Sequence, residues 1–217
     1  MIELPLFPLN TVLFPGTPVT LHIFEERYKK MFHRCITQQE PFGVVLIQRG
    51  LEALGPIAEP FAIGCTARIT FVEELDGGRL NVIGVGGERF RINSVNRDQD
   101  YLVGSVEILP LDFEPQQNLL LAGRDLRPWV KQYLKLLIDA DLIKLNLDSL
   151  PYDPLEFAYL SAHFLQTPIH QKQELLEVNR GTQLMENIRG IYQREVALLR
   201  SMLAIKEPAG DSQASLN

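Results

Sequence analysis

Few residues in this chain have the types and spacing that catalysis or cofactor binding requires. Residues 84–89 (GVGGER) partly match the G-x-G-x-x-G fingerprint that holds a dinucleotide pyrophosphate. Arg89 stands where the third glycine belongs, and the residues after it predict a strand rather than the helix whose N-terminus would face the pyrophosphate. We therefore interpret these glycines as part of a β-turn or bulge.

Metal-binding and nucleophilic motifs are equally weak. The four histidines, whose spacing does not match H-E-x-x-H or a similar ligand set, are His22, His33, His163 and His170. The acidic pairs at 98–100 and 139–141 are typical of solvated loops and helix ends rather than of a Mg²⁺ site. Ser149 and Lys144 are close only in the sequence, and no P-loop string occurs. The residues therefore predict no metal, no cofactor and no enzyme activity.

The composition is that of an ordinary globular protein. The chain has 217 residues, 46% of them hydrophobic, and a formal net charge of −6, which disfavours general binding to nucleic-acid phosphates. The sequence has neither a basic and apolar leader nor an apolar run long enough to span a membrane, so we expect a cytoplasmic protein without membrane contact. Cys35 and Cys65 have no metal-ligand spacing and are expected to be free, buried thiols.

The first half of the chain reads as β-rich with one helix. Apolar residues at helical spacing predict a helix over 24–39. In residues 66–73, Ala67, Ile69 and Phe71 alternate with polar residues, which predicts a strand with these three on one face. Residues 76–78 (DGG) predict a hairpin turn. Further strands are predicted at 42–47, 79–85, 90–95 and 101–109, and so many short strands indicate a closed or nearly closed β-barrel.

The second half reads as helical after a linker at 109–115. A periodic region over 119–143 is predicted to be interrupted near Arg127-Pro128, where the proline would either kink the helix or start a new one. Asp153-Pro154 predicts an N-cap followed by a helix to residue 165. Thr167-Pro168 likewise predicts an N-cap, followed by a helix to about residue 178. A long helix is predicted over 180–204, followed by a disordered tail over 205–217.

The last predicted helix carries a seam of apolar residues near coiled-coil spacing. The members of this seam are Leu184, Ile188, Ile191, Leu198 and Met202. Such a seam packs either against the helices of the same chain or against a second copy. The seam therefore has two interpretations, packing within the chain or a homodimer through this helix.

The chain also opens with a distinctive series of blocks at 4–9 (LPLFPL), 14–16 (FPG) and 21–28 (LHIFEERY). Further blocks follow at 42–46, 64–69, 76–82 and 87–92, and in the helical half at 153–154 and 171–177. In this order the series resembles the N-terminal domain of the Lon protease family. That domain also occurs in cereblon and in short stand-alone proteins, and the resemblance covers residues 2 to about 203.

The resemblance implies an α+β fold. Residues 1–112 would form a PUA-like β-barrel with one inserted helix, and residues 116–204 an α-helical bundle that ends in a long helix. In a full-length Lon protease, ATPase and Ser–Lys protease domains would follow. We expect this chain to lack both, and therefore to have no catalytic activity.

Lon N-terminal domains are thought to contact unfolded or degron-bearing proteins. The resemblance therefore implies a non-catalytic module that recognises unfolded or partner polypeptides, with a role in protein quality control. Candidate binding residues come from an apolar segment over 50–63 that has no helical or strand period: Leu51, Leu54, Ile57 and Phe61. The alternative interpretation is a loop folded over an open end of the barrel.

Two other classes of function remain open. PUA-like domains often bind RNA, and a basic cluster between residues 27 and 34 is interleaved with Tyr28 and Phe32. These aromatic residues have the spacing of a buried helical face, which disfavours RNA binding. The other alternative is a sensor with a small-molecule pocket at the barrel mouth.

Overall fold

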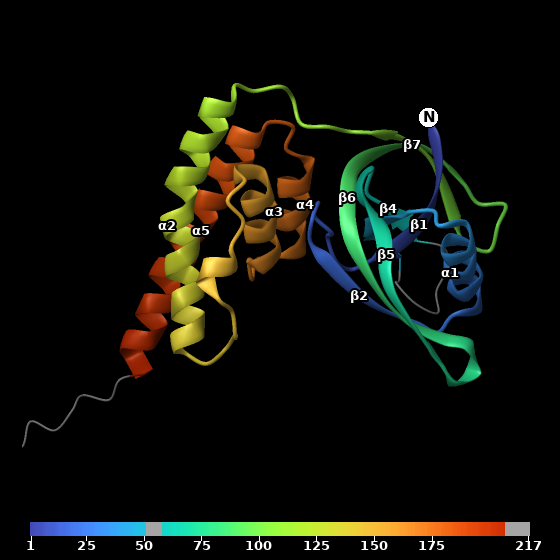
Figure 1. Ribbon diagram of the computed structural model, residues 1–217, viewed down its shortest axis with the longest axis horizontal. Coiled ribbons are helices and arrows are strands. Elements are labelled where there is room, and N and C mark those ends of the chain that lie inside the picture. Colours follow the sequence, from blue (N-terminus) through green and yellow to red (C-terminus); the bar gives the residue numbers. More distant parts are fainter. Residues whose placement is uncertain (51–57, 207–217) are drawn as a thin grey trace, which may run out of the picture.

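The computed structural model describes residues 1–50 and 58–206, with side chains as far as residue 201. Its elements are β1 (Ile2–Leu9), β2 (Pro18–Ile23), α1 (Glu26–Gln38), β3 (Phe42–Arg49), β4 (Glu59–Pro60), β5 (Ile63–Leu75), η1 (Asp76–Gly78), β6 (Arg79–Asn96), β7 (Leu102–Ile108), α2 (Gln116–Asp139), η2 (Leu147–Ser149), α3 (Pro154–Phe164), α4 (Ile169–Glu177) and α5 (Gly181–Lys206). Strands dominate the first half and helices form the second (Figure 1), which confirms the predicted α+β class. The tail beyond residue 206 and three predicted binding residues, Leu51, Leu54 and Ile57, lie outside the described residues.

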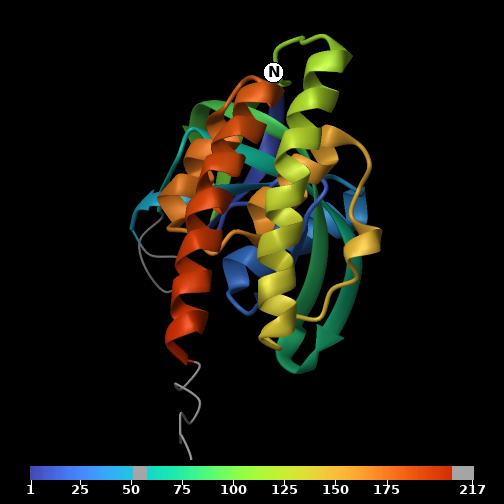
Figure 2. The same cartoon turned by 90° about the vertical axis from the view of Figure 1, so that its left-hand side faces the viewer.

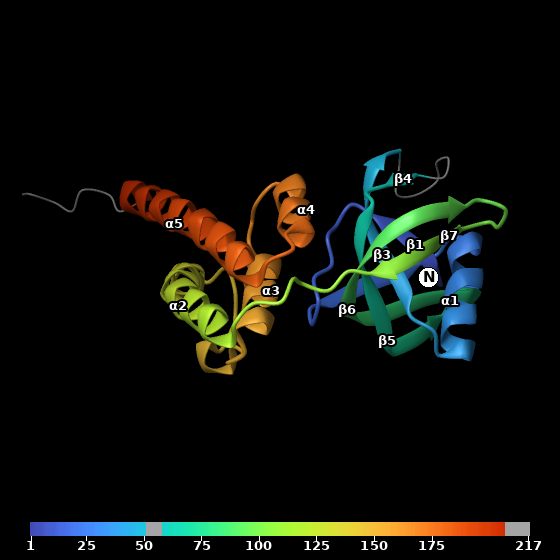
Figure 3. The same cartoon turned by 90° about the horizontal axis from the view of Figure 1, so that it is seen from above.

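The strands close into a ring. β1 pairs antiparallel with β7 and parallel with β3, and β6 and β5 complete the circuit between them. Two strands branch from the ring, because β2 pairs with β6 and β4 pairs with β3. The ring is therefore less regular than a simple barrel, and Figure 3 shows it beside the helices, with α3 and α4 nearest to it. The more specific PUA-like assignment stays a prediction.

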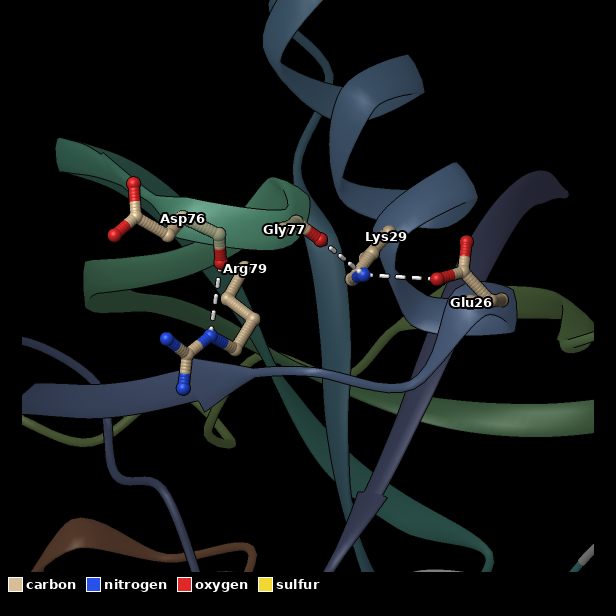
Figure 4. Close-up of polar contacts among 5 residues, drawn as sticks. All are labelled: Glu26, Lys29, Asp76, Gly77 and Arg79. Carbon is tan, nitrogen blue, oxygen red and sulfur yellow. Dashed lines mark hydrogen bonds and ion pairs between the residues drawn. The ribbon is translucent and has the colours of Figure 1, made fainter.

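The long strands β5 and β6 form a hairpin whose tip is held against α1. The chain turns at Gly77, whose φ of +73° is a conformation that glycine adopts without strain. Lys29 of α1 donates to the Gly77 carbonyl and to the Glu26 carboxylate, both at 2.8 Å (Figure 4). Arg79 Nε donates to the Asp76 carbonyl at 3.0 Å within the turn. The predicted turn is confirmed, and these contacts fix the direction of the hairpin.

A bulge in β5 corrects the predicted alternation of this strand. Ile69 pairs with Gly84 but Phe71 pairs with Ile83, so Thr70 is an extra residue. The Thr70 hydroxyl donates to the Ile83 carbonyl at 3.1 Å. Because the extra residue reverses the faces of the strand, Phe71 does not share the half-buried face of Ile69 and is instead 53% exposed.

The periodic region forms one helix, α2, that continues through Pro128, so the alternative of a new helix starting there is wrong. Pro128 lies inside it and removes one backbone donor. Leu126 and Val130 flank the proline, and both are completely buried in the same hydrophobic core. The core therefore holds both flanks of the proline, while Pro128 itself is exposed to solvent.

The two predicted helix caps differ in outcome. Asp153 caps α3 as predicted, because its carboxylate accepts the backbone N–H groups of Leu155 and Glu156 at 2.9 Å each. The cap predicted at Thr167 is wrong, since α4 begins one residue later, after Pro168. The Thr167 hydroxyl donates instead to the Gln171 side chain.

The apolar seam of α5 is buried within the protein's own helical half over its first part. Leu184, Ile188 and Ile191 all belong to the main hydrophobic core. Further along the helix, Leu198 is 54% exposed. Among the seam residues whose side chains the structure describes, which exclude Met202, Leu198 is the exposed one. A homodimer through α5 stays a prediction.

A buried arginine joins the sheet to the helices. Arg89 of β6 is only 3% exposed, and its guanidinium donates to the carbonyl oxygens of Leu176 at 2.7 Å, Val178 at 2.5 Å and Pro110 at 3.3 Å. Burial lowers the pKa of this guanidinium, but arginine titrates so far above neutral pH that it stays charged. Gln173 of α4 adds a second link by donating to a β5 carbonyl at 3.0 Å.

The hydrophobic core crosses the same junction. Phe14, in the loop between β1 and β2, is completely buried, and its ring centroid lies 6.3 Å from that of Tyr159 in α3. Leu46 and Ile63 of the sheet belong to the same cluster as the buried faces of α2, α3 and α5. The division into subdomains 1–112 and 116–204 stays a prediction.

Both cysteines are free and buried, as predicted. Burial raises the pKa of Cys35 to about 11 and that of Cys65 to about 12, so almost no thiolate is present at neutral pH. We therefore expect neither thiol to react with DTNB in the folded protein, and both to react after unfolding in guanidinium chloride. Release of the chromophore before denaturant is added would contradict this expectation.

Candidate functional site

The one predicted binding residue that the structure describes, Phe61, is half-buried. It packs against the main core, and its ring centroid lies 6.2 Å from that of His170 in α4. Phe61 therefore contributes to the junction between sheet and helices. Its role in binding a partner stays a prediction.

A cleft of about 620 Å³ lies among four strands, β1, β5, β6 and β7. We call it the sheet cleft. Its apolar lining comes from Ile2, Leu4, Val85, Val106 and Ile108. Arg68 and Glu88 contribute one charge of each sign. An apolar lining with a few polar groups is the general character of a binding site rather than of a solvated surface.

Gly86 and Gly87 line the sheet cleft and account for the glycine-rich string. Two residues, Gly87 and Glu88, lie opposite the single residue Thr66, and Thr66 Oγ1 accepts the Glu88 N–H at 2.8 Å. A Cβ atom at Gly87 would lie 2.6 Å from Thr66 Oγ1, and one at Gly86 would lie 2.1 Å from the Phe14 carbonyl oxygen. The predicted bulge is therefore confirmed, and the glycines permit a close approach of backbone.

Beside the sheet cleft, Phe71 and Ile83 form an exposed apolar pair across the β5–β6 hairpin. They are 53% and 36% exposed. Val85, which lines the cleft, is two residues from Ile83 along β6, so both side chains point to the same face. The apolar area therefore continues from the cleft onto the hairpin. We call the sheet cleft together with Phe71 and Ile83 the sheet surface.

A hydrogen-bonded polar row borders this apolar pair. Asn81 donates its side-chain N–H to Glu73 at 2.8 Å, which turns its oxygen toward His22 Nδ1, also at 2.8 Å. The His22 Nδ1 must therefore carry the proton in this contact. Phe24 lies at the end of the row, 46% exposed and with its ring centroid 6.1 Å from that of His22. These contacts give His22 a packing role.

The titratable groups do not assemble into a reactive centre in the part of the chain that the structure describes. No group of three His, Cys, Asp or Glu side chains lies close enough together there to hold a metal ion. Burial, and then the charge of Lys172, lower the pKa of His163, which packs against Phe164. Within residues 1–50 and 58–206, every helix is too short or too polar to cross a membrane.

The basic cluster on α1 is largely neutralised. Its two aromatic members, Tyr28 and Phe32, are buried as the helical spacing predicted. Each of its arginine and lysine side chains has a carboxylate partner, in the pairs Arg27–Glu25, Lys29–Glu26, Lys30–Asp100 and Arg34–Glu40. The helix therefore offers neither stacking rings nor unpaired arginine and lysine charges to a phosphate backbone.

Sequence reasoning missed the sheet surface for two reasons. The apolar lining is drawn from four strands that are far apart in the chain, and the bulge at Thr70 reverses the apparent alternation of β5. One residue could have indicated this surface from the sequence. Ile83 is apolar, yet it alternates with the same period as the polar residues Arg79 and Asn81 on β6. Such a residue on a polar face indicates an exposed contact.

Known proteins of one family are similar to this chain in sequence. The model of the substrate-binding domain of ATP-dependent protease La (Lon) matches residues 3–191. Curated relatives include Lon protease 2 of Syntrophobacter fumaroxidans, 23% identical over 94% of this chain, and Lon protease of Porphyromonas gingivalis, 26% identical over 82%. These alignments cover 26% and 22% of the relatives, so the chain spans about a quarter of their length.

Solved structures give the same result. A Lon N-terminal domain protein from Xanthomonas campestris superposes with a TM-score of 0.62 and 26% identity, covering 87% of this chain and 97% of that one. The N-terminal domain of Mycobacterium avium complex Lon protease shares the fold at 18% identity, with a TM-score of 0.63, and covers 88% of this chain and 98% of that one. The chain therefore belongs to the family of the Lon protease substrate-binding domain.

Proposed function

We propose that this protein is a non-catalytic module that binds unfolded or partner polypeptides through the sheet surface. The observation that carries the proposal is the exposed Phe71–Ile83 pair, which continues the apolar lining of the sheet cleft. Contiguous exposed apolar residues often mark a binding surface. The family, which is that of a substrate-binding domain, supports the same conclusion. Protein quality control in the cytoplasm is the proposed setting.

The residues predicted from the sequence are a proposed second contact. These are Leu51, Leu54, Ile57 and Phe61. Phe61 lies on the junction with α4, so a polypeptide held by this segment would also pass close to the helices. We propose no chemical step, because the sheet surface offers apolar contacts and satisfied polar groups.

Binding of this kind is expected to be weak. Burying about 500 Å² of apolar surface, counted over both partners, contributes about 12 kcal/mol. The loss of translational and rotational freedom offsets at least about 4 kcal/mol of that gain. A dissociation constant in the micromolar range or weaker follows.

The proposal predicts that the double variant Phe71→Thr/Ile83→Thr binds a polypeptide about tenfold more weakly. Threonine is itself a β-branched residue that strands favour, and it removes apolar area at both positions, so the sheet itself is expected to persist. The measurement is fluorescence anisotropy with a labelled neutral peptide of alternating apolar and polar residues. Circular dichroism of each variant checks the fold.

The matched control is Leu142→Ser, which removes an apolar side chain that is 67% exposed after α2, away from the sheet surface. We expect this variant to bind like the wild type. Equal binding by the double variant and the wild type would remove the sheet surface from the proposal. The absence of saturable binding by the wild-type protein would overturn the polypeptide-binding function itself.

A further inference from the structure

A second groove lies in the helical half, far along the chain from the sheet surface. It has a volume of about 530 Å³ and runs between α2 and the segment that leads into α3. Figure 2 faces α2, with α5 on one side of it and this segment on the other. We call it the α2 groove. Its apolar contacts come from Leu120, Pro128, Tyr152 and Pro154.

Two of these apolar residues are unusually exposed. Tyr152 is 92% exposed and Leu120 is 52% exposed. Gly123 also lines the groove, and it faces Pro154 so closely that a Cβ atom there would lie 2.9 Å from the proline Cβ. The floor of the groove is therefore tightly packed, while the tyrosine and leucine at its sides remain uncovered.

The groove is also cationic on one side. Arg124, Arg127 and Lys131 line it from a single stripe of α2, at i, i+3 and i+7, and none of its eight lining residues is acidic. This is a local reversal in a chain whose formal net charge is −6. Even with Asp125, which lies outside the lining and pairs with Arg124, the three cations leave a net positive charge at the groove, which favours an anionic partner.

The three cationic side chains do not converge on a single point. The Arg127 guanidinium stacks over the Phe157 ring at 4.0 Å and donates to the Pro151 carbonyl, which fixes its place in the wall. Arg124 is paired with the neighbouring Asp125 at 3.1 Å, and its side chain is 71% exposed. Lys131 lies seven positions after Arg124, which is about 10 Å along a helix axis.

This spacing decides between kinds of anion. A single phosphate is too small to contact both ends of a stripe of about 10 Å. A polypeptide can carry several carboxylates, on successive helical turns or on alternate residues of an extended chain, and can therefore contact several cations of the stripe. Apolar side chains between these carboxylates would cover Tyr152 and Leu120. Apolar contact and charge therefore point to the same occupant.

We propose that the α2 groove binds a short acidic polypeptide segment in which apolar side chains alternate with carboxylates. Binding here does not depend on the sheet surface. It would add selection by charge to a protein whose other proposed surface selects by apolar character alone.

The test uses a labelled peptide of alternating leucine and glutamate and the whole 217-residue chain. The charge-reversal variant Arg124→Glu/Lys131→Glu is expected to bind this peptide at least tenfold more weakly, and Tyr152→Ser about fivefold more weakly. A peptide with glutamine in place of glutamate should bind weakly to all variants, and added salt should weaken binding of the acidic peptide.

The matched control is Arg97→Glu/Arg200→Glu, which changes the net charge by the same amount at exposed positions outside the groove. It should retain binding. Equal loss in this control, or wild-type affinity in both groove variants, would overturn the proposal. Loss in Phe71→Thr/Ile83→Thr would assign the acidic peptide to the sheet surface instead. Displacement of the peptide by single-stranded RNA at lower concentration than by unlabelled peptide would make the occupant a nucleic acid, which also contradicts the proposal.

Discussion

Replacing Arg89 with methionine is expected to lower the free energy of unfolding by about 2–4 kcal/mol. The guanidinium is buried and donates to three backbone carbonyls, those of Leu176, Val178 and Pro110. Methionine fills much of the same space without any donor, so these carbonyls lose a charged partner. Relief from burying a charge offsets part of the loss, which is why the expected effect is not larger.

The matched control for this variant is Arg91→Met on the same strand. Arg91 lies two residues further along β6, and its pair with Glu107 is loose, at 3.7 Å, with both side chains nearly half exposed. We expect this change to cost less than about 0.5 kcal/mol. Urea denaturation of both variants gives the comparison, and equal unfolding midpoints would show that the Arg89 contacts contribute nothing to stability.

A second measurement separates a local effect from general weakening. Because Arg89 links β6 to the end of α4, amide hydrogen exchange in α4 is expected to rise more than exchange in α2, whose core contacts are with α5 and α3. A uniform rise over the whole chain would contradict the assignment of Arg89 to the junction.

The contacts of Arg89 at the junction could not be predicted from the sequence. The hairpin turn at 76–78 and the Asp153 cap depend on residues within three positions of one another, so local patterns were enough to predict them. The partners of Arg89 lie 21, 87 and 89 residues away. Nothing in the spacing of Arg89 indicates them, and the sequence showed only that this arginine breaks a glycine motif.

The sheet surface was hidden by a different cause. A period-2 pattern predicts faces correctly only while the pairing register is regular, and the single extra residue Thr70 reverses that pattern. The pattern therefore placed Phe71 on the same face as Ala67 and Ile69. Local signals also failed in the helical half. Tertiary packing of α2 prevented a new helix from starting at Pro128, and α4 begins one residue later than the cap predicted at Thr167.

Replacing Gly86 with alanine is expected to lower the free energy of unfolding by about 3 kcal/mol or more. The added Cβ would lie 2.1 Å from the Phe14 carbonyl oxygen and 3.0 Å from its carbon, so backbone rather than a flexible side chain must move. The Phe14–Thr17 turn cannot retreat easily. Gly86 exchanges backbone hydrogen bonds with Gly16 and Thr17, at 2.8 and 2.9 Å, and the Phe14 ring is completely buried against α3.

The matched control is Gly84→Ala, two residues earlier on β6. There the new Cβ would meet its nearest neighbours at 3.4–3.5 Å, which is ordinary van der Waals contact. Its backbone φ is not in the left-handed region, so alanine is expected to change stability by less than about 1 kcal/mol. Thermal unfolding of the two variants tests whether close packing between β6 and the Phe14 turn, rather than glycine flexibility, is what the glycine string provides. Similar unfolding temperatures for both would contradict that reading, because they share a strand and a substitution and differ only in the space available.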